Sequence, residues 1–557
     1  ALALAARAGP APDGPGLPEA ALPLPGAGVV AALVVLAALL TPPAWTAAFD
    51  VAAGVPDARL VRDDWPFHAE LGQHLAWADA MRSGGIQGRD FFSLYGPLYT
   101  GTLSATWAVF GRSLAAANLW DAGLHVAGLA LVLVVACALV RHRALVLVVP
   151  LVALFAHLRL ALPIAALLPL LRWHGRRGLA APALAGAITG AALMFSQEFG
   201  SASVLATGSV FALLRAGRAA VAWAAGAIAV MVVVLAPFVG HGALGPMLGD
   251  LSSYPRWLIA GFGKLPFPSP LAGLPLDLAN ARTAPALVLR LGLAIAFACF
   301  AAVVLVLPRG AIAAGRVGEA WRGLGARVGA SPTGFAALWL GVFGLVSFRS
   351  ALGRSDLSHL TPLAPVAALL LVLAVDRVLA AARARALPWA TAATRLAALA
   401  LLAWAGAFTT LAAPATLVGD TVRVVGARLR GAEPATGDAH VWAVTQRIHA
   451  LTGPEDAILV LPNSGAYYYL AERRNPTRFA MAHQMVTNAH RAEALRALRA
   501  DPPRLVVWDD AGGRVDGIED SRVLGATLLA WLDAHYELAE TVGPVRLLRP
   551  RGEAAGR

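Results

Sequence analysis

Two adjacent carboxylates, Asp63 and Asp64, stand in a polar stretch that follows the first long apolar run of the chain. A carboxylate beside an acceptor hydroxyl group can remove its proton as a general base, while its neighbour orients the substrate or a metal ion. Charged groups at a membrane boundary are costly to keep near hydrocarbon, so the pair is a candidate site. A solvated acidic loop is the alternative.

A second set of candidates could bind an anion. Arg349, Arg354 and His359 lie in one short polar turn, and guanidinium groups offer paired donors to phosphate oxygens. They predict a phosphate clamp, with residues that cap or snorkel at helix ends as the alternative. Glu198, between two apolar runs, is either a cap at a turn or a site group, and we expect the site. Further candidates for substrate binding lie in the first polar loop, namely His68, Asp90 and Tyr95.

The composition restricts the class of protein. The chain has 557 residues, of which 58% are hydrophobic and 14% charged, and its mean hydropathy is +0.65. Soluble domains carry about 25% charged residues, so this composition indicates a membrane protein. The net charge of +12 is spread over short connecting loops, which favours a role in membrane orientation over nucleic-acid binding. Cys137 and Cys299 lie in apolar runs and offer neither a disulfide framework nor metal-ligand spacing.

Apolar runs predict a polytopic α-helical membrane protein of about 11–12 spans. Residues 1–26, rich in Ala, Pro and Gly, are expected to be disordered, and the first run is expected to be a retained signal anchor. The stretch 96–111 is short, and we expect it to be partly inserted or interfacial. The runs lie at about 27–48, 114–140, 144–157, 160–172, 179–196, 201–214, 219–239, 286–307, 333–350, 361–375 and 396–414.

The arginines predict the orientation. They cluster after the second, fourth, sixth, eighth and tenth runs, and all five of these loops are cytoplasmic if the N-terminus is inside. This topology places the candidate residues on the outer face. It also places there an amphipathic helix over residues 67–82, which we expect to lie on the membrane surface.

The character of the chain changes after about residue 415. A helix near 440–451 and strands near 457–462, 504–508 and 544–549 predict a small periplasmic α/β domain over 415–557, following a transmembrane domain over 27–414 that has an outer loop at 49–95. The segment 463–479 is rich in Tyr and Arg. It predicts a surface helix and turn, or a surface that faces a sugar or an acceptor.

These features resemble the GT-C superfamily of polytopic glycosyltransferases, the group of protein mannosyltransferases, aminoarabinose transferases and arabinofuranosyltransferases. The resemblance rests on the acidic pair Asp63-Asp64, on the segment from Arg89 to Leu98 (Arg-Asp-Phe-Phe-Ser-Leu-Tyr-Gly-Pro-Leu), on the many spans and on the outer C-terminal domain. Tyr-Gly-Pro-Leu stands where relatives often have a Lys-Pro-Pro-Leu type of segment, which argues against a close lipid A transferase. The Trp-Trp-Asp motif of the oligosaccharyltransferases is also absent from the sequence.

The resemblance implies a glycosyltransferase (EC 2.4.-.-) that moves a sugar from a polyprenyl-phosphate donor to an extracytoplasmic glycan, lipid or protein, with inversion. Asp63 or Asp64 would be the base, and Arg354, His359 and Arg349 would bind the donor phosphate. No cofactor is certain, and a divalent cation at the aspartates stays open. We expect a multi-pass protein of the bacterial inner membrane with its site facing the periplasm, in contact with membrane lipids and not with nucleic acid.

Three alternatives stay open. A lipid-linked glycan flippase or transporter would place its ionisable residues near mid-membrane. An O-antigen ligase or polymerase would centre on one large outer loop, and the stretch of about 240–285 keeps this alternative. A non-catalytic membrane anchor for the tail would leave the gathered outer residues without a role.

Overall fold

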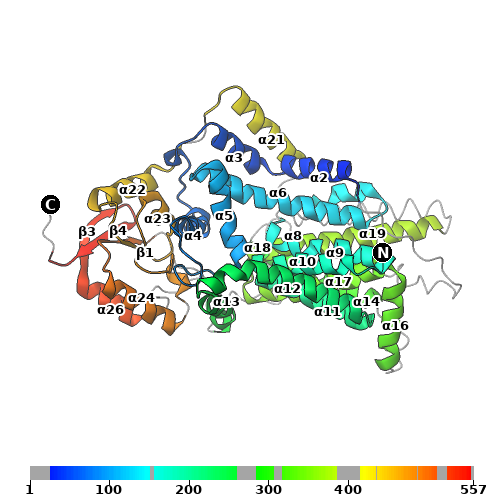
Figure 1. The fold of residues 1–557 in the computed structure, drawn as a ribbon. Coiled ribbons are helices and arrows are strands. Elements are labelled where there is room, and N and C mark those ends of the chain that lie inside the picture. Colours follow the sequence, from blue (N-terminus) through cyan, green and yellow to red (C-terminus); the bar gives the residue numbers. More distant parts are fainter. Residues whose placement is uncertain are drawn as a thin grey trace. The chain divides into compact units, whose positions relative to one another are not determined.

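The computed structural model describes residues 25–150, 156–259, 284–306, 317–384, 414–433, 436–485, 487–510 and 524–552. The chain divides into two compact units, each assembled from three separate stretches. Unit 1 comprises residues 1–45, 122–233 and 265–425, and unit 2 comprises residues 46–121, 234–264 and 426–557 (Figure 1). The expected disorder of residues 1–26 and the expected span at 396–414 fall almost wholly outside the described residues.

Unit 1 is helical, as its apolar composition predicts (Figure 1). The boundary between the units falls within some helices, for example within α6 and α12. The helices of unit 1 are α2 (Ala27–Leu39), α6 (Leu114–Leu139), η3 (Arg143–Val148), α8 (Leu158–Ala165), α9 (Leu167–Arg176), α10 (Ala180–Phe195), α11 (Gln197–Leu213), α12 (Gly217–Gly240), α14 (Ala284–Val306), α16 (Val317–Ala330), α17 (Pro332–Gly353), α18 (Leu357–Leu360), η4 (Thr361–Leu363), α19 (Ala364–Ala384) and α21 (Pro414–Leu429).

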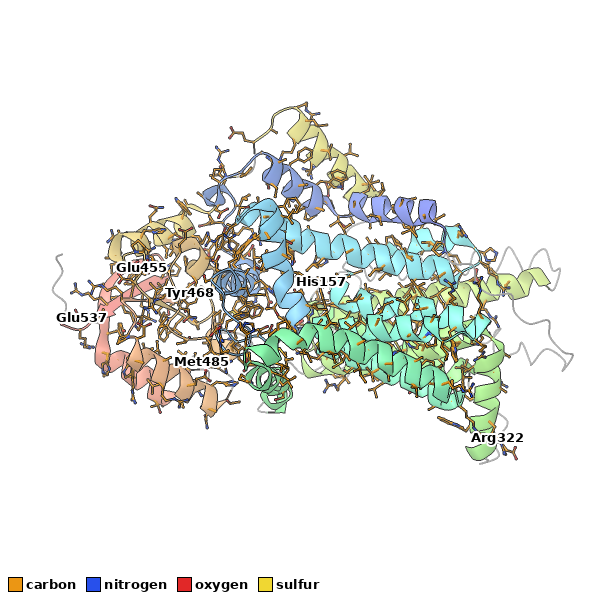
Figure 2. The ribbon with its side chains drawn as sticks, viewed as in Figure 1. His157, Arg322, Glu455, Tyr468, Met485 and Glu537 are labelled. Atoms are coloured by element: carbon orange, nitrogen blue, oxygen red, sulfur yellow. The ribbon has the colours of Figure 1, made fainter. Side chains whose placement is uncertain are left out.

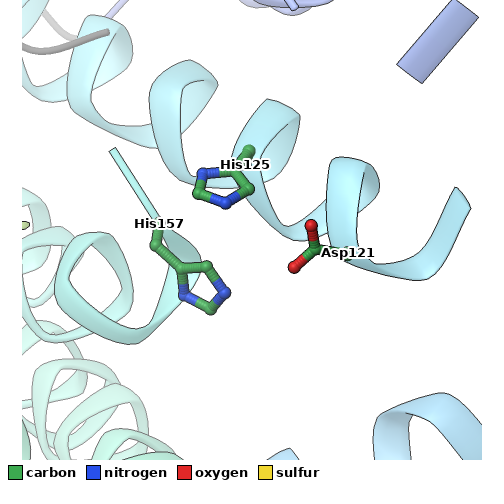
Figure 3. A group of neighbouring side chains, drawn as sticks. All are labelled: Asp121, His125 and His157. Atoms are coloured by element: carbon green, nitrogen blue, oxygen red, sulfur yellow. The ribbon is translucent and has the colours of Figure 1, made fainter. Parts of the chain in front are cut away.

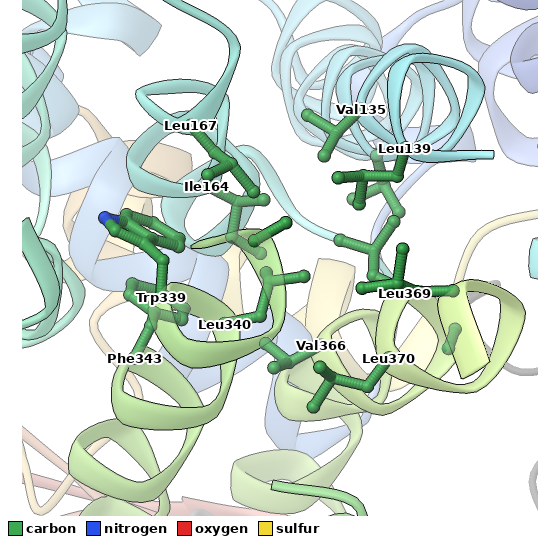
Figure 4. Close-up of a cluster of buried hydrophobic side chains, with 14 of the residues drawn as sticks. Val135, Leu139, Ile164, Leu167, Trp339, Leu340, Phe343, Val366, Leu369 and Leu370 are labelled. Atoms are coloured by element: carbon green, nitrogen blue, oxygen red, sulfur yellow. The ribbon is translucent and has the colours of Figure 1, made fainter. Parts of the chain in front are cut away.

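The core of unit 1 is built around α17. Trp339 stacks on Phe343 with a ring separation of 5.2 Å, and its indole N–H donates to the hydroxyl of Thr207 on α11 at 3.0 Å. The hydrogen bond satisfies the one polar atom of a fully buried indole. Aliphatic side chains of α6, α8, α9 and α19 pack in the same cluster, among them Leu139, Ile164, Leu167 and Leu369 (Figure 4).

Four stretches of helix are long and apolar enough to cross a membrane among the residues that the structure describes. They are α6, α12, α17 and the run Leu357–Arg377. The expected count of about 11–12 spans stays a prediction. The first apolar run, which we expect to be a retained signal anchor, is bent, because α2 and α3 (Pro42–Ala52) meet at an angle of 84°. Pro42 and Pro43 begin the second helix, and a proline ring cannot continue the hydrogen-bond pattern of the helix before it.

Unit 2 combines helices with one mixed sheet of order β1-β2-β4-β3. Its β1 and β2 are parallel, and β4 runs antiparallel to both β2 and β3. Its elements are α3, η1 (Asp57–Arg59), η2 (Pro66–Leu71), α4 (Gly72–Arg82), α5 (Pro97–Phe110), α13 (Leu244–Ile259), α22 (Ala439–Leu451), β1 (Ile458–Leu461), α23 (Ala466–Ala471), η5 (Ala482–Gln484), α24 (Asn488–Ala500), β2 (Leu505–Asp509), α26 (Ala526–His535), β3 (Tyr536–Val542) and β4 (Val545–Pro550).

The predicted helix near 440–451 and the three predicted strands are confirmed as α22, β1, β2 and β4. The sequence analysis missed β3, which forms a hairpin with β4. Its sequence, Tyr-Glu-Leu-Ala-Glu-Thr-Val, carries two glutamates and is largely exposed, as suits a strand at the edge of a sheet. A weak alternation of this kind gives little signal before the partner strand is known.

The three tyrosines of the tyrosine-rich segment are buried. Tyr467, Tyr468 and Tyr469 on α23 are at most 5% exposed, so the expected surface helix was wrong for these residues, whereas Glu472 and Arg474 in the turn after them are exposed. The backbone N–H of Val460 on β1 donates to the hydroxyl oxygen of Tyr468 at 2.9 Å. Figure 2 labels Tyr468, Glu455 and Glu537 in the tail, and of these three side chains only that of Tyr468 is buried. The rings therefore build the core of unit 2.

The predicted amphipathic helix is present as η2 followed by α4, but it is packed inside unit 2. Phe67, Leu75 and Trp77 are at most 1% exposed, so the expected placement on a membrane surface was wrong for this apolar face. Gly72 explains the close packing, because a Cβ atom there would clash with the backbone nitrogen of Ala466 on α23. The first polar loop and the tail share one core as a result.

An ion-pair cluster around Arg112 joins the same two stretches. Its guanidinium group donates to both carboxylate oxygens of Asp79 at 2.7 and 2.8 Å, and to Glu472 at 2.9 Å. It also lies 4.0 Å from the ring centre of Tyr469. The Tyr469 hydroxyl donates to Asp57 at 2.6 Å, which fixes the start of the polar loop.

A second buried cluster joins α13 to the tail. Arg478 donates to Asp250 at 2.6 Å and to Glu493 at 2.5 Å, and the Asp250 side chain is only 3% exposed. Burial, supported by the negative charge of Glu493, outweighs the attraction of Arg478 and raises the pKa of Asp250 to about 6. One guanidinium group therefore serves two carboxyl groups, of which one is reluctant to ionise.

The raised pKa of Asp250 predicts a pH-dependent stability. An unfolded Asp has a pKa of about 3.9, so between about pH 4 and pH 6 the folded chain keeps a proton that the unfolded chain releases. Stability should therefore fall as the pH rises through this window, by up to about 3 kcal/mol from this group. We expect the wild type to lose stability relative to Asp250→Asn between pH 4 and pH 6, measured by thermal unfolding in detergent.

Asp420→Asn is the matched control, because Asp420 pairs with Arg423 on an exposed face. Its stability should follow that of the wild type across the window. A difference between wild type and Asp250→Asn that does not change with pH would contradict the assignment.

Candidate functional site

The two aspartates of the first polar loop have different surroundings. Asp64 accepts a hydrogen bond from the backbone N–H of Phe67 at 2.7 Å, which caps the start of η2, and its second oxygen lies 3.2 Å from Arg62. Both oxygens of Asp64 therefore have partners that hold the loop in place. This side chain begins the helix that carries His68.

Asp63 faces a buried histidine. Its Oδ1 lies 3.3 Å from Nε2 of His68, whose side chain is 4% exposed, while that of Asp63 is 42% exposed. Within the part of the chain that the structure describes, neither ring nitrogen of His68 has a hydrogen-bond partner. The ring packs between Phe67 and Tyr467, at 5.4 and 5.3 Å. Asp63 is thus open to solvent on one side and backed by an imidazole on the other.

Asp90 and Tyr95 have structural contacts in unit 2. Asp90 accepts from the backbone N–H of Ile86 at 2.8 Å and from Arg89 at 2.7 Å, and the Arg89 hydrogen bond lowers the pKa of this carboxyl group. Tyr95 packs against His74 at 5.8 Å and Tyr99 at 5.1 Å. Asp90 therefore closes a turn, and the Tyr95 ring belongs to an aromatic cluster.

The cationic turn of unit 1 is organised by a carboxylate. Asp356 accepts from Arg354 at 2.8 Å, and its other oxygen lies 2.7 Å from Nδ1 of His359. Burial opposes ionisation of Asp356, but the hydrogen bonds from His359, Ser358 and Arg354 outweigh it and hold its pKa well below the usual range. The structure brings Arg354 and His359 together, as the sequence analysis expected, around an acid that it did not select.

Glu198 lies in the same group. It lies in the first turn of α11 and is half-buried, and Arg159, His359 and Arg349 all attract its carboxylate. Arg159 was missed in the sequence analysis. The available signal was a lone arginine between two apolar runs, since a cation in such a position needs a partner or a functional role.

The predicted site residues thus form two sets. Unit 2 holds Asp63, Asp64 and His68, and unit 1 holds Glu198, Arg349, Arg354 and His359. That the two sets act on one substrate stays a prediction. The sequence analysis also missed a group of possible metal ligands, Asp121, His125 and His157.

No protein-family model and no curated protein sequence matches the chain. Among solved structures, it is similar to ArnT from Cupriavidus metallidurans bound to undecaprenyl phosphate, with 14% identity and a TM-score of 0.48 over 96% of this chain and 100% of that chain. It is also similar to the apo state of that ArnT, with 13% identity and a TM-score of 0.48 over 94% of this chain and 97% of that chain.

The archaeal oligosaccharyltransferase AglB from Archaeoglobus fulgidus, in complex with an inhibitory peptide and a dolichol-phosphate, gives 12% identity and a TM-score of 0.45, over 94% of this chain and 74% of that chain. Both proteins belong to the GT-C superfamily. With identities of 14% or less and TM-scores below 0.5, these similarities leave the function to be argued from the residues of this chain.

The two aspartates should respond differently to substitution. Asp64→Ala removes the cap of the Phe67 N–H, so we expect a loss of about 1 kcal/mol in the free energy of unfolding. Asp64→Asn keeps a capping oxygen and should lose little. Asp63→Ala removes no hydrogen bond within the described structure and should stay near the wild type in thermal unfolding. Equal destabilisation by Asp63→Ala and Asp64→Ala would refute the division of roles.

Proposed function

We propose that this protein is a membrane glycosyltransferase that moves a sugar from a polyprenyl-phosphate donor to an extracytoplasmic glycan, lipid or protein acceptor. The observation that carries the proposal is the contrast between the two adjacent aspartates. The Asp64 carboxylate accepts a hydrogen bond at the start of a helix, whereas the Asp63 carboxylate stays accessible beside the buried imidazole of His68. A carboxylate that lies beside a buried side chain and stays accessible to solvent suits a general base.

The cationic group of unit 1 supports binding of the donor phosphate. Among its side chains, the guanidinium groups of Arg159, Arg349 and Arg354 outnumber the carboxylates of Glu198 and Asp356 by one. His359 lies between the two acids and adds a second positive charge when it is protonated. Cationic side chains that neighbouring carboxylates already hold in position can stabilise a phosphate without rearranging.

The proposed reaction is a direct displacement. Asp63 takes the proton of the acceptor hydroxyl group as its oxygen forms a bond to the anomeric carbon. The bond from that carbon to the phosphate oxygen breaks, and the lipid phosphate leaves with the electron pair, stabilised by the cationic group. Attack on the face opposite the leaving group inverts the anomeric centre. The mechanism requires both sets of residues to reach the same substrate, on the outer face of the membrane.

His68 has a supporting role in this mechanism. Its ring cannot move freely, because Phe67 and Tyr467 pack on it and almost none of it is exposed. It therefore limits the positions that the Asp63 carboxylate can take. A divalent cation between the aspartates remains compatible with the proposal, as Asp63 can provide an oxygen ligand.

Transfer with purified protein and a panel of polyprenyl-phosphate sugars tests the proposal. Loss of a general base typically costs about 100- to 10,000-fold in rate, so we expect Asp63→Asn to lower kcat by that range with little change in KM. Asp64→Asn should retain most of the activity, because it keeps the capping oxygen. Arg349→Gln should mainly raise the KM for the donor.

Asp420→Asn serves as the control, since it removes an acid of an exposed ion pair. Full activity of Asp63→Asn would exclude Asp63 as the base. Retention of configuration in the product would exclude direct displacement. Movement of lipid-linked sugar across vesicles without any transfer would favour the transporter over the enzyme.

A further inference from the structure

We infer that Asp121, His125 and His157 form a binding site for one divalent transition-metal ion, which the proposed transfer reaction does not use. One potential ligand atom from each side chain lies within 4.8 Å of the other two. Figure 3 shows the two imidazole rings and the carboxylate turned toward a common space between the helices. The three residues come from α6 and from the start of α8.

The spacing on α6 fixes two of the ligands. Asp121 and His125 are four positions apart, so they lie on one face of the helix, one turn from each other. The division into two units passes directly after Asp121, but α6 is one continuous helix. The position of Asp121 relative to His125 is therefore set by the helix itself.

The third ligand is brought in by a close contact between helices. His157 precedes α8, and its ring lies 5.0 Å from that of His125 at an interplanar angle of 87°. Gly128 on α6 allows this approach, because a Cβ atom there would lie 2.6 Å from the carbonyl carbon of His157 and 2.7 Å from the carbonyl oxygen of Ala156. A side chain at position 128 would push the two histidines apart.

The ligand types select the class of ion. Two imidazoles and one carboxylate suit Zn²⁺ and its first-row neighbours, whereas Mg²⁺ and Ca²⁺ prefer sets of oxygen ligands. Zinc–nitrogen distances of about 2.0–2.1 Å require ligand atoms about 3.4 Å apart in a tetrahedron, a spacing that rotation of these side chains can reach. Three protein ligands leave a fourth position for water or an anion.

The position of Asp121 within a candidate membrane span favours a bound ion. Helix α6 is one of the four candidate membrane spans, and Asp121 is the only charged residue in its sequence. Ionisable residues within a span are rare and usually serve a partner, an ion or a proton. An ion held between α6 and α8 would compensate the Asp121 charge and tie the two helices together.

Metal titration of the full-length protein tests the inference. The protein, purified in detergent with a tag that contains no histidine and stripped with a chelator, is titrated with Zn²⁺ and separately with Co²⁺. We expect one ion per chain and a tetrahedral Co²⁺ absorption spectrum. Asp121→Asn, His125→Ala and His157→Ala should each weaken binding by more than about 10-fold, which is the least that loss of a supporting residue costs at metal sites.

Two further variants separate a lost ligand from a lost fold. Gly128→Val keeps all three ligands but separates the helices, so it should also lose the ion. His125→Cys replaces one ligand by another, and it should keep the Co²⁺ ion and add a sulfur-to-metal band. The wild type has Cys137 and Cys299 buried elsewhere and should lack that band.

The control is the double variant His241→Ala/His449→Ala, which removes two exposed imidazoles and should bind Zn²⁺ as the wild type does. Equal binding by the wild type and by His125→Ala would overturn the inference, as would loss of binding in the control. Sugar transfer is not measured in any of these experiments, so their outcome is independent of the proposed function.

Discussion

The ion pair between Arg112 and Asp79 is the contact on which the arrangement of unit 2 depends. Asp79 lies in the last turn of α4, and the same guanidinium group reaches Glu472 and the Tyr469 carbonyl oxygen in the tail, at 2.9 and 3.0 Å. Because the Arg112 and Asp79 side chains are only 23% and 29% exposed, the pair is weakly screened by water. It holds residues that are far apart in the sequence in one core.

Other buried or half-buried charged side chains also have specific partners of opposite charge. Asp356 collects Arg354 and His359, while Asp250 and Glu493 share Arg478. Asp50 lies 2.6 Å from Arg428, with a side chain that is 4% exposed. A charge taken out of water loses hydration that only a close counter-ion can replace. The pairs Arg428–Asp50 and Arg478–Asp250 also join segments that are distant in the chain.

The sequence predicted the local elements well where a strong periodicity was present. The apolar runs became α6, α10, α12 and α17, and the alternating stretches of the tail became β1, β2 and β4. It failed where a neighbour decides the outcome. The face of α4 was predicted to meet lipid, but it packs on α23, and the tyrosines of α23 are core residues for the same reason. Apolar periodicity predicts that one face of a helix is covered, but it does not predict which segment or lipid covers that face.

The sequence by itself determined that this chain is rich in helices suited to a membrane, that its Asp63-Asp64 pair follows the first apolar run, and that two arginines and a histidine share one turn. Only the tertiary structure separated Asp64, which caps a helix, from Asp63, which faces His68. Only the tertiary structure placed Glu198 near His359 and Arg349, and His157 beside His125. The physical reason is that residue type and helical spacing are local properties. The partner of a charged or ligating side chain is chosen by packing between segments that are distant in the chain.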